Sequence, residues 1–147
     1  MAKLIITILM LSLFTLAIRA QIPTGFKLME LPQPPIVRQQ IESKHPGWTT
    51  SLEDVKFNLK SITVFDGNPK DLASLVPDKS IKGKTENYSV WSFDPKSKRE
   101  IWIKCEFSST TVSLAKSLSP GIKELRIYYN PNIMIDGNRQ IEKVLFR

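Results

Sequence analysis

The residues of this chain that could support nucleophilic catalysis are few. There is one histidine, His45, and one cysteine, Cys105. A Ser/His/Asp or Cys/His centre would have to use His45, which stands directly before Pro46 in a proline-rich stretch, and there is no Gly-x-Ser-x-Gly motif. One histidine and one cysteine cannot make a zinc site, and no Asp-x-Asp-x-Asp-Gly calcium loop occurs. We therefore predict no nucleophilic centre and no metal site.

Paired carboxylates are the remaining catalytic possibility. Glu100 and Glu106 fall on one face of a predicted strand, but six residues at about 3.3 Å place them roughly 20 Å apart. Glycosidases use carboxylates about 5 to 10 Å apart. Asp66, Asp71 and Asp78 are explained by turns and a helix start. The glycines form no phosphate-binding loop, so we predict a protein that is not an enzyme and holds no cofactor.

Aromatic side chains are the residues that we interpret as functional. Period-two alternation predicts Trp102 on the solvent face of one strand, and Tyr128 on the solvent face of another strand beside Arg126. Large rings outside the core are frequent anchors for a partner. We therefore predict partner binding by these three side chains. The alternative is a second core, in which the leader or the 69–76 segment covers Trp102.

The N-terminus predicts export. Residues 4–18 carry no charge in a chain of 147 residues, and this run is too short to span about 30 Å of hydrocarbon comfortably. A run that follows Lys3 and ends near a small residue, Ala20, is typical of a secretory signal peptide over residues 1–20. An uncleaved anchor and a buried helix are the alternatives. Cleavage would leave a periplasmic or secreted protein without a transmembrane span.

The charge of the chain favours anionic partners. The formal net charge is +7, and loss of Lys3 and Arg19 with the signal peptide lowers it to +5. Such a surface attracts anionic envelope polymers or lipid headgroups at long range, whereas export argues against nucleic acid as a partner. The charges are dispersed, with no run of five of one sign, so solubility is the alternative explanation.

Proline and strand patterns divide the mature chain in two. Residues 21–51 contain five prolines and are predicted to form an extended leader, in which 36–44 fits a helix or a strand. Residues 52–147 are predicted to form a β-rich domain. Short apolar runs separated by turn residues predict an antiparallel meander, folded as a small sandwich or partly open barrel. The fold class is mainly β, with one short helix.

Individual elements follow from local signals. The main predicted strands are 59–65, 88–93, 99–107, 123–129 and 140–146. The strands 88–93 and 99–107 are predicted to form a hairpin. The residue types in 68–77 favour a helix of at most two turns, and the polar stretch 78–87 is predicted to be a loop.

Alternation assigns the buried faces of two strands. One face of 101–107 carries Ile101, Ile103, Cys105 and Phe107, and is predicted to face the core. Residues 125, 127 and 129 form the inward face of a later strand. Cys105 is therefore predicted to be a buried structural thiol with a raised pKa, the alternative being intermolecular pairing.

A set of short motifs resembles a known family. These are FDGNP at 65–69, LASLVPD at 72–78, WSF at 91–93, IWIKCEF at 101–107 and the Pro-Gly pair at 120–121. Their order and spacing over 62–147 resemble a family of small secreted or periplasmic bacterial proteins of unknown function. The resemblance implies a signal peptide but no catalytic residues. The family pattern has further cysteines where this chain has Leu125 and Phe146, so it implies no disulfide here.

These observations predict an exported monomeric binding module of the bacterial envelope. A protein partner is favoured, such as an envelope enzyme or a toxin that the domain blocks. The alternative is a binder of anionic envelope polymers or lipid headgroups, and an enzyme with a carboxylate site is third. Salt dependence separates the first two, because binding through anionic groups weakens most with ionic strength.

Overall fold

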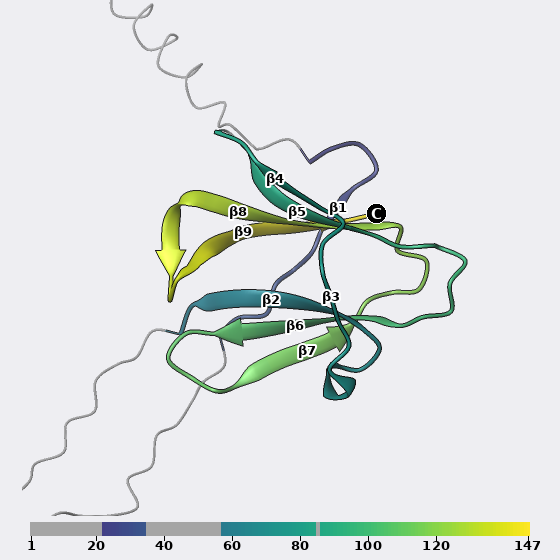
Figure 1. Cartoon of the computed structure of the whole chain (residues 1–147), viewed down its shortest axis with the longest axis horizontal. Coiled ribbons are helices and arrows are strands. Elements are labelled where there is room, and N and C mark those ends of the chain that lie inside the picture. Colours follow the sequence, from purple (N-terminus) through teal and green to yellow (C-terminus); the bar gives the residue numbers. More distant parts are fainter. Residues whose placement is uncertain (1–21, 35–56, 85) are drawn as a thin grey trace, which may run out of the picture.

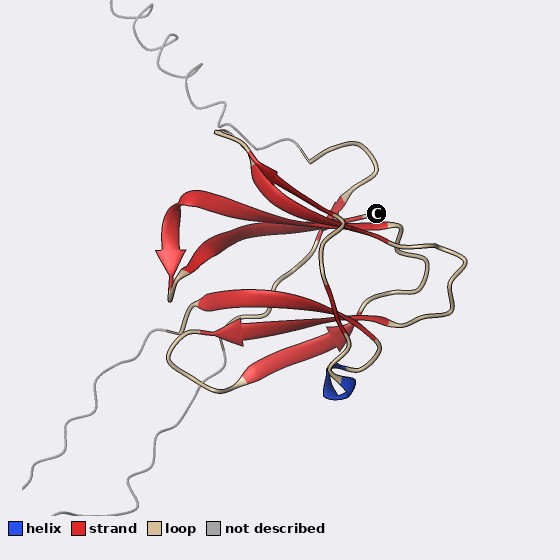
Figure 2. Cartoon of the chain, viewed as in Figure 1, coloured by secondary structure: helices blue, strands red, loops and turns tan. Residues whose placement is uncertain are grey.

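The computed structural model describes residues 22–34, 57–84 and 86–147, which form two facing antiparallel sheets (Figure 1). The first sheet has the order β1-β9-β8-β5-β4 and the second the order β3-β2-β6-β7. The strands are β1 (Lys27–Leu28), β2 (Leu59–Asp66), β3 (Ser74–Leu75), β4 (Lys79–Lys82), β5 (Asn87–Ser92), β6 (Ile101–Phe107), β7 (Ser113–Ser117), β8 (Glu124–Ile135) and β9 (Asn138–Phe146). Among these residues the only helix is the 3₁₀ turn η1 (Pro69–Asp71) (Figure 2). The predicted mainly β sandwich with one short helix is confirmed.

The hydrophobic core lies between the two sheets. Strand alternation points one row of side chains from each strand into this space. The central cluster consists of Met29, Val64, Trp91, Ile103, Leu118, Leu125, Ile127 and Val144. Cys105 and Phe107 are each 2% exposed, and Tyr129 packs against the cluster. The inward faces predicted for 101–107 and for residues 125, 127 and 129 are therefore confirmed.

The predicted hairpin of 88–93 with 99–107 is wrong. β5 pairs with β4 and β8 in the first sheet, whereas β6 pairs with β2 and β7 in the second. The connection between them passes from one layer to the other at the right of Figure 1. The turn signal itself is real, because the Asp94 carboxylate accepts the Lys96 N–H at 2.9 Å. A local turn fixes the direction of a few residues, but it does not decide which strands pair.

The polar stretch 78–87, predicted as a loop, contains β4. This strand pairs with β5, with Lys79 opposite Val90 and Lys82 opposite Asn87. All four of its residues are exposed because it is an edge strand. An exposed edge has no apolar face, and its sequence therefore resembles that of a loop.

The short helix is confirmed as a single turn and extends less far than expected. The Asn68 side chain accepts the Lys70 N–H at 3.0 Å, as an N-cap does, and Pro69 occupies the first turn. Leu72 then takes a left-handed conformation with φ +58° and ends the turn. The chain continues into β3, so 72–77 is not helical.

Residues 22–34 of the predicted leader lie against the domain. β1 pairs with β9, and Met29 is 6% exposed in the core. The Met29 N–H donates to the Val144 carbonyl at 2.9 Å. Other expectations, the signal peptide at 1–20, the 36–44 element and the loop position of His45, lie outside the described residues. The boundary between 21–51 and 52–147 stays a prediction.

Cys105 carries a first testable prediction. Burial raises the pKa of its thiol to about 11, partly opposed by the charge of Lys116. The folded state therefore binds more protons than the unfolded state between about pH 9 and 11, and stability falls as pH rises through this window. We expect a loss of up to about 3 kcal/mol that is absent from Cys105→Ala, measured by urea unfolding across this pH range.

The burial of Cys105 also predicts that its thiol reacts slowly in the folded protein. At neutral pH a thiol reagent should label Cys105 only after the chain is unfolded in urea. Fast labelling of the folded chain would contradict the inward orientation of this side chain.

Candidate functional site

Arg126 and Tyr128 lie on the outer face of the first sheet. The Tyr128 ring stacks on the Tyr88 ring of β5, with centroids 4.8 Å apart and planes at 27°. The Lys143 ammonium of β9 lies 4.7 Å from the Tyr128 ring centroid. These contacts follow from the pairing of β8 with β5 and β9, which places all three side chains on one face.

Phe26 extends this cluster from the segment before β1. The guanidinium carbons of Arg126 and Arg147 lie 4.4 and 5.0 Å from the Phe26 ring centroid. Both cations also bind the Glu124 carboxylate, Arg126 through Nε at 2.6 Å and Arg147 through Nη2 at 2.5 Å. Each arginine is therefore held by both a ring and a carboxylate.

The Glu124 carboxylate is the electrostatic centre of this cluster. Burial acts to raise its pKa, but hydrogen bonds from Arg126 and Arg147 outweigh burial and bring the pKa below its usual value. The stabilisation is present at neutral pH and is lost as pH falls through the lowered pKa. Because Glu124 binds both arginines and both arginines contact Phe26, the cluster joins the leader to the sheet.

The prediction that Tyr128 lies on a wet face is wrong. The side chain does point away from the core, but Tyr128 is only 8% exposed. Its cover comes from Tyr88 and Lys143, which lie on neighbouring strands. Sequence alternation identifies the face but not these neighbours, because they depend on the pairing of β8 with β5 and β9.

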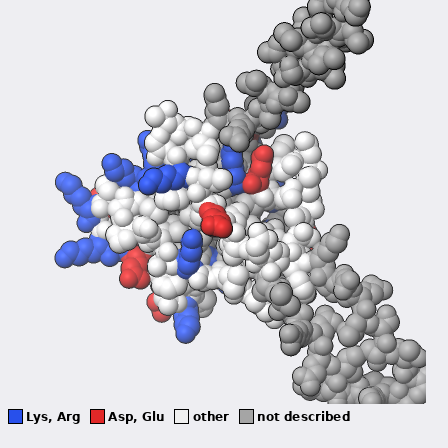
Figure 3. All heavy atoms as spheres, turned by 180° about the vertical axis from the view of Figure 1, so that it is seen from behind, with Lys and Arg blue, Asp and Glu red and all other residues white. Residues whose placement is uncertain are grey.

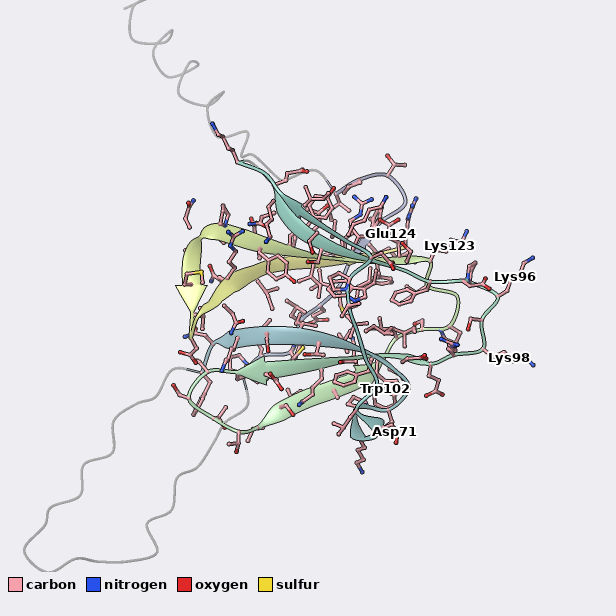
Figure 4. The ribbon with its side chains drawn as sticks, viewed as in Figure 1. Asp71, Lys96, Lys98, Trp102, Lys123 and Glu124 are labelled. Atoms are coloured by element: carbon pink, nitrogen blue, oxygen red, sulfur yellow. The ribbon has the colours of Figure 1, made fainter. Side chains whose placement is uncertain are left out.

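Trp102 lies on the outer face of the second sheet. It is half-buried, and its indole Nε1 donates to Glu100 Oε2 at 3.1 Å. Phe65 stands opposite it on β2 and is 6% exposed, although it faces away from the core. The turn η1 contacts β6, and Figure 4 shows Trp102 beside Asp71 of that turn. The burial of Trp102 is thus intermediate between the solvent-facing and the second-core interpretation.

Two exposed apolar residues follow η1, the turn that contacts β6. Leu72 closes η1 and is 82% exposed, and Val76 follows β3 and is 83% exposed. Leu72 also has φ +58°, a conformation that is unfavourable for a residue with a bulky side chain. Sequence reasoning missed both because they were assigned to a helix. We call Trp102, η1 and Leu72 the Trp102 surface.

The structure does not bring the three predicted binding residues together. Arg126 and Tyr128 share one cluster on the first sheet. Trp102 lies on the opposite outer face of the sandwich, on the second sheet. A single partner patch containing all three is therefore excluded by the fold.

Two further properties concern residues 22–34, 57–84 and 86–147 only. Within these ranges no three His, Cys, Asp or Glu side chains are grouped so that they could hold a metal ion. The same ranges contain no helix with the length and hydropathy of a membrane span.

A protein-family model, described as Type VI secretion system Tli immunity protein, matches residues 53–143, which is more than half of the chain. The chain belongs to this family. Its expected membership of a family of small bacterial proteins is thus confirmed at that level. No curated protein and no solved structure matches the chain.

The two outer faces differ in how much of each lies within the range that the Tli immunity family model matches. It contains the whole Trp102 surface, together with Arg126 and Tyr128. Phe26, which contacts Arg126, and Arg147, which binds the same Glu124 carboxylate as Arg126, lie outside it. The Trp102 surface thus belongs entirely to the part of the chain that the family model describes.

Proposed function

We propose that this chain is an immunity protein that binds a toxin of a type VI secretion system and blocks it without chemistry of its own. Membership of the Tli immunity protein family carries the proposal. Blocking a toxin requires a rigid surface with a few well-placed anchors, and a two-sheet sandwich can supply such a surface.

The Trp102 surface is the toxin contact that we favour. Tryptophan is enriched among residues that dominate binding energy, and the exposed Leu72, which ends the turn that contacts β6, adds apolar area. The left-handed Leu72 supports the same choice, because backbone strain often accumulates at binding sites. Arg126 and Tyr128 are less suited, since their rings and charges are already engaged within the chain.

We place this activity in the periplasm. The uncharged run at 4–18 with Ala20 behind it has the pattern of a signal peptide. A toxin injected into the envelope of a neighbouring cell would meet its immunity protein there.

The proposal predicts protection between sister cells. Recipient cells that lack this chain should be killed by attackers with an active type VI system. Recipients that express it should survive about as well as they do when the type VI system of the attackers is inactive. Colony counts of recipients after mixed growth measure this. Equal survival with and without the chain would contradict the proposed function.

Location is tested in the same assay. A chain lacking residues 2–20 should accumulate in the cytoplasm and fail to protect. Full protection by that variant would contradict the periplasmic part of the proposal and leave the toxin-binding part standing.

Charge distribution supports the second candidate, binding of an anionic envelope polymer. On the face that Figure 3 shows, several Lys and Arg side chains gather at one end, on the left of the picture. Lys96, Lys98 and Lys123 lie on loops at this end, on the right in Figure 4. Changing these three residues to glutamate should abolish polymer binding if this candidate is correct, and should leave protection intact if the protein is an immunity protein.

A further inference from the structure

A cleft opens at the other end of the sandwich from these loops. It has a volume of about 370 Å³ and takes residues from both sheets. Its lining residues are Lys60, Ser61, Ile62, Ser80, Lys82, Asn87, Ser89, Tyr129, Asn138, Arg139 and Ile141. The cleft therefore lies where β2, β5 and β9 begin and β4 ends.

Three cations line this cleft, and no carboxylate does. They are Lys60 of β2, Lys82 of β4 and Arg139 of β9. Among the described residues none of them forms an ion pair. Glu106 feels the charge of Lys60, but Lys104 already binds it at 2.8 Å. Three like charges around one hollow create a positive potential that attracts anions.

Hydrogen-bonding groups complete the walls. Asn87 and Ser89 are 6% and 8% exposed, and the Ser80 and Ser89 hydroxyls are 3.2 Å apart. Burial raises the pKa of Tyr129, with the Ser89 hydrogen bond opposing it, so the phenol keeps its proton at neutral pH. Hydroxyl and amide donors near cations suit carboxylate oxygens.

Apolar side chains at the cleft favour a protein occupant. Ile62 and Ile141 contribute to its lining. At the β8–β9 hairpin, Met134 stands opposite Arg139, on the same face of the sheet, and is 57% exposed. A sugar polymer or a lipid headgroup gains little from such residues, whereas protein interfaces combine apolar anchors with a charged rim.

We infer that this cleft receives an acidic segment of the toxin, with its carboxylates among Lys60, Lys82 and Arg139. The inference rests on the proposed function and names the chemistry of the partner. Lys60 and Phe65, the neighbour of Trp102, are both on β2, roughly 17 Å apart along the strand. One interface of ordinary size can cover that length, so the cleft and the Trp102 surface can bind the same toxin.

Charge reversal tests the inference in the protection assay. The cleft variant carries Lys60→Glu, Lys82→Glu and Arg139→Glu. The matched control carries Lys96→Glu, Lys98→Glu and Lys123→Glu, which changes the net charge equally at the far end. We expect recipient survival to fall by roughly a hundredfold or more for the cleft variant only, because unlike charges set both attraction and partner choice. Thermal unfolding shows whether each variant is folded. If the cleft variant does not fold, a variant with glutamine at the same three positions is used instead.

Direct probes separate the possible occupants. A ten-residue glutamate peptide and phosphatidylglycerol vesicles are each titrated against the protein, purified in the form in which it accumulates in cells. Peptide binding that the cleft variant loses and the control keeps supports the inference. Vesicle binding lost in the cleft variant with protection unchanged overturns it in favour of a membrane surface. Full protection by a folded cleft variant overturns the cleft alone, whereas failure of the unmodified chain to protect overturns the proposed function as well.

Discussion

Replacing Tyr128 with alanine is expected to lower the free energy of unfolding by about 3 to 5 kcal/mol, the range for a buried aromatic ring. The ring is 8% exposed, stacks on Tyr88 and lies under the Lys143 ammonium, and alanine removes all of these contacts. For a domain of this size Tm should fall by roughly 10 to 20 °C. Thermal and urea unfolding of the purified chain measure the change.

Two companion variants identify the cause. Tyr128→Phe keeps the ring and should stay within about 1 kcal/mol of the unmodified chain. Combining Tyr128→Ala with Tyr88→Ala should be less harmful than the sum of the single changes by about 0.5 to 1.5 kcal/mol, the energy of a stacked pair. If Tyr128→Ala changed stability by less than 1 kcal/mol, the ring would be free and the original solvent-facing interpretation would stand.

The faces of the strands could be predicted because they are encoded locally. Every second residue of β6 and β8 is apolar, so alternation alone places Ile103 and Leu125 inside and Trp102 and Arg126 outside. The mainly β class follows from the same periodicity. The N-cap at Asn68 is also local, since it needs only a side-chain oxygen two residues before an N–H.

The pairing of strands could not be predicted in the same way. β5 pairs with β8, more than thirty residues away, rather than with its sequence neighbour β6. Turn residues such as Asp94 record a change of direction but not the layer that the chain enters next. β4 was missed for a related reason, because an edge strand exposed on both faces has no hydrophobic alternation.

These two failures explain the errors at the candidate site. The cover of Tyr128 arises from β5, and the cover of Arg126 from Phe26 in the leader, so both depend on tertiary pairing. Leu72 was missed because glycine or asparagine usually occupies a left-handed position after a helical turn. The three cations of the cleft come from β2, β4 and β9, and no spacing in the sequence connects them.

Replacing Trp102 with alanine is expected to weaken toxin binding by roughly thirtyfold or more, the effect of losing a dominant interface ring. Stability should fall by only about 1 to 2 kcal/mol, because the ring is half-buried against Phe65 and η1. Recipient survival in the sister-cell assay reports binding, and thermal unfolding reports the fold. Unchanged protection would contradict the Trp102 surface, and a loss of 3 to 5 kcal/mol would make Trp102 a core residue.

Leu72→Gly separates binding from folding at the same surface. Glycine accepts the left-handed conformation at φ +58° without strain, so stability should stay level or rise by up to about 1 kcal/mol. The leucine side chain is 82% exposed, so its removal disturbs little packing within the chain. If the Trp102 surface contacts the toxin, protection should nevertheless decrease. A purely structural role for Leu72 cannot explain a variant that is at least as stable but protects less. Unchanged protection would show that Leu72 is not part of the interface.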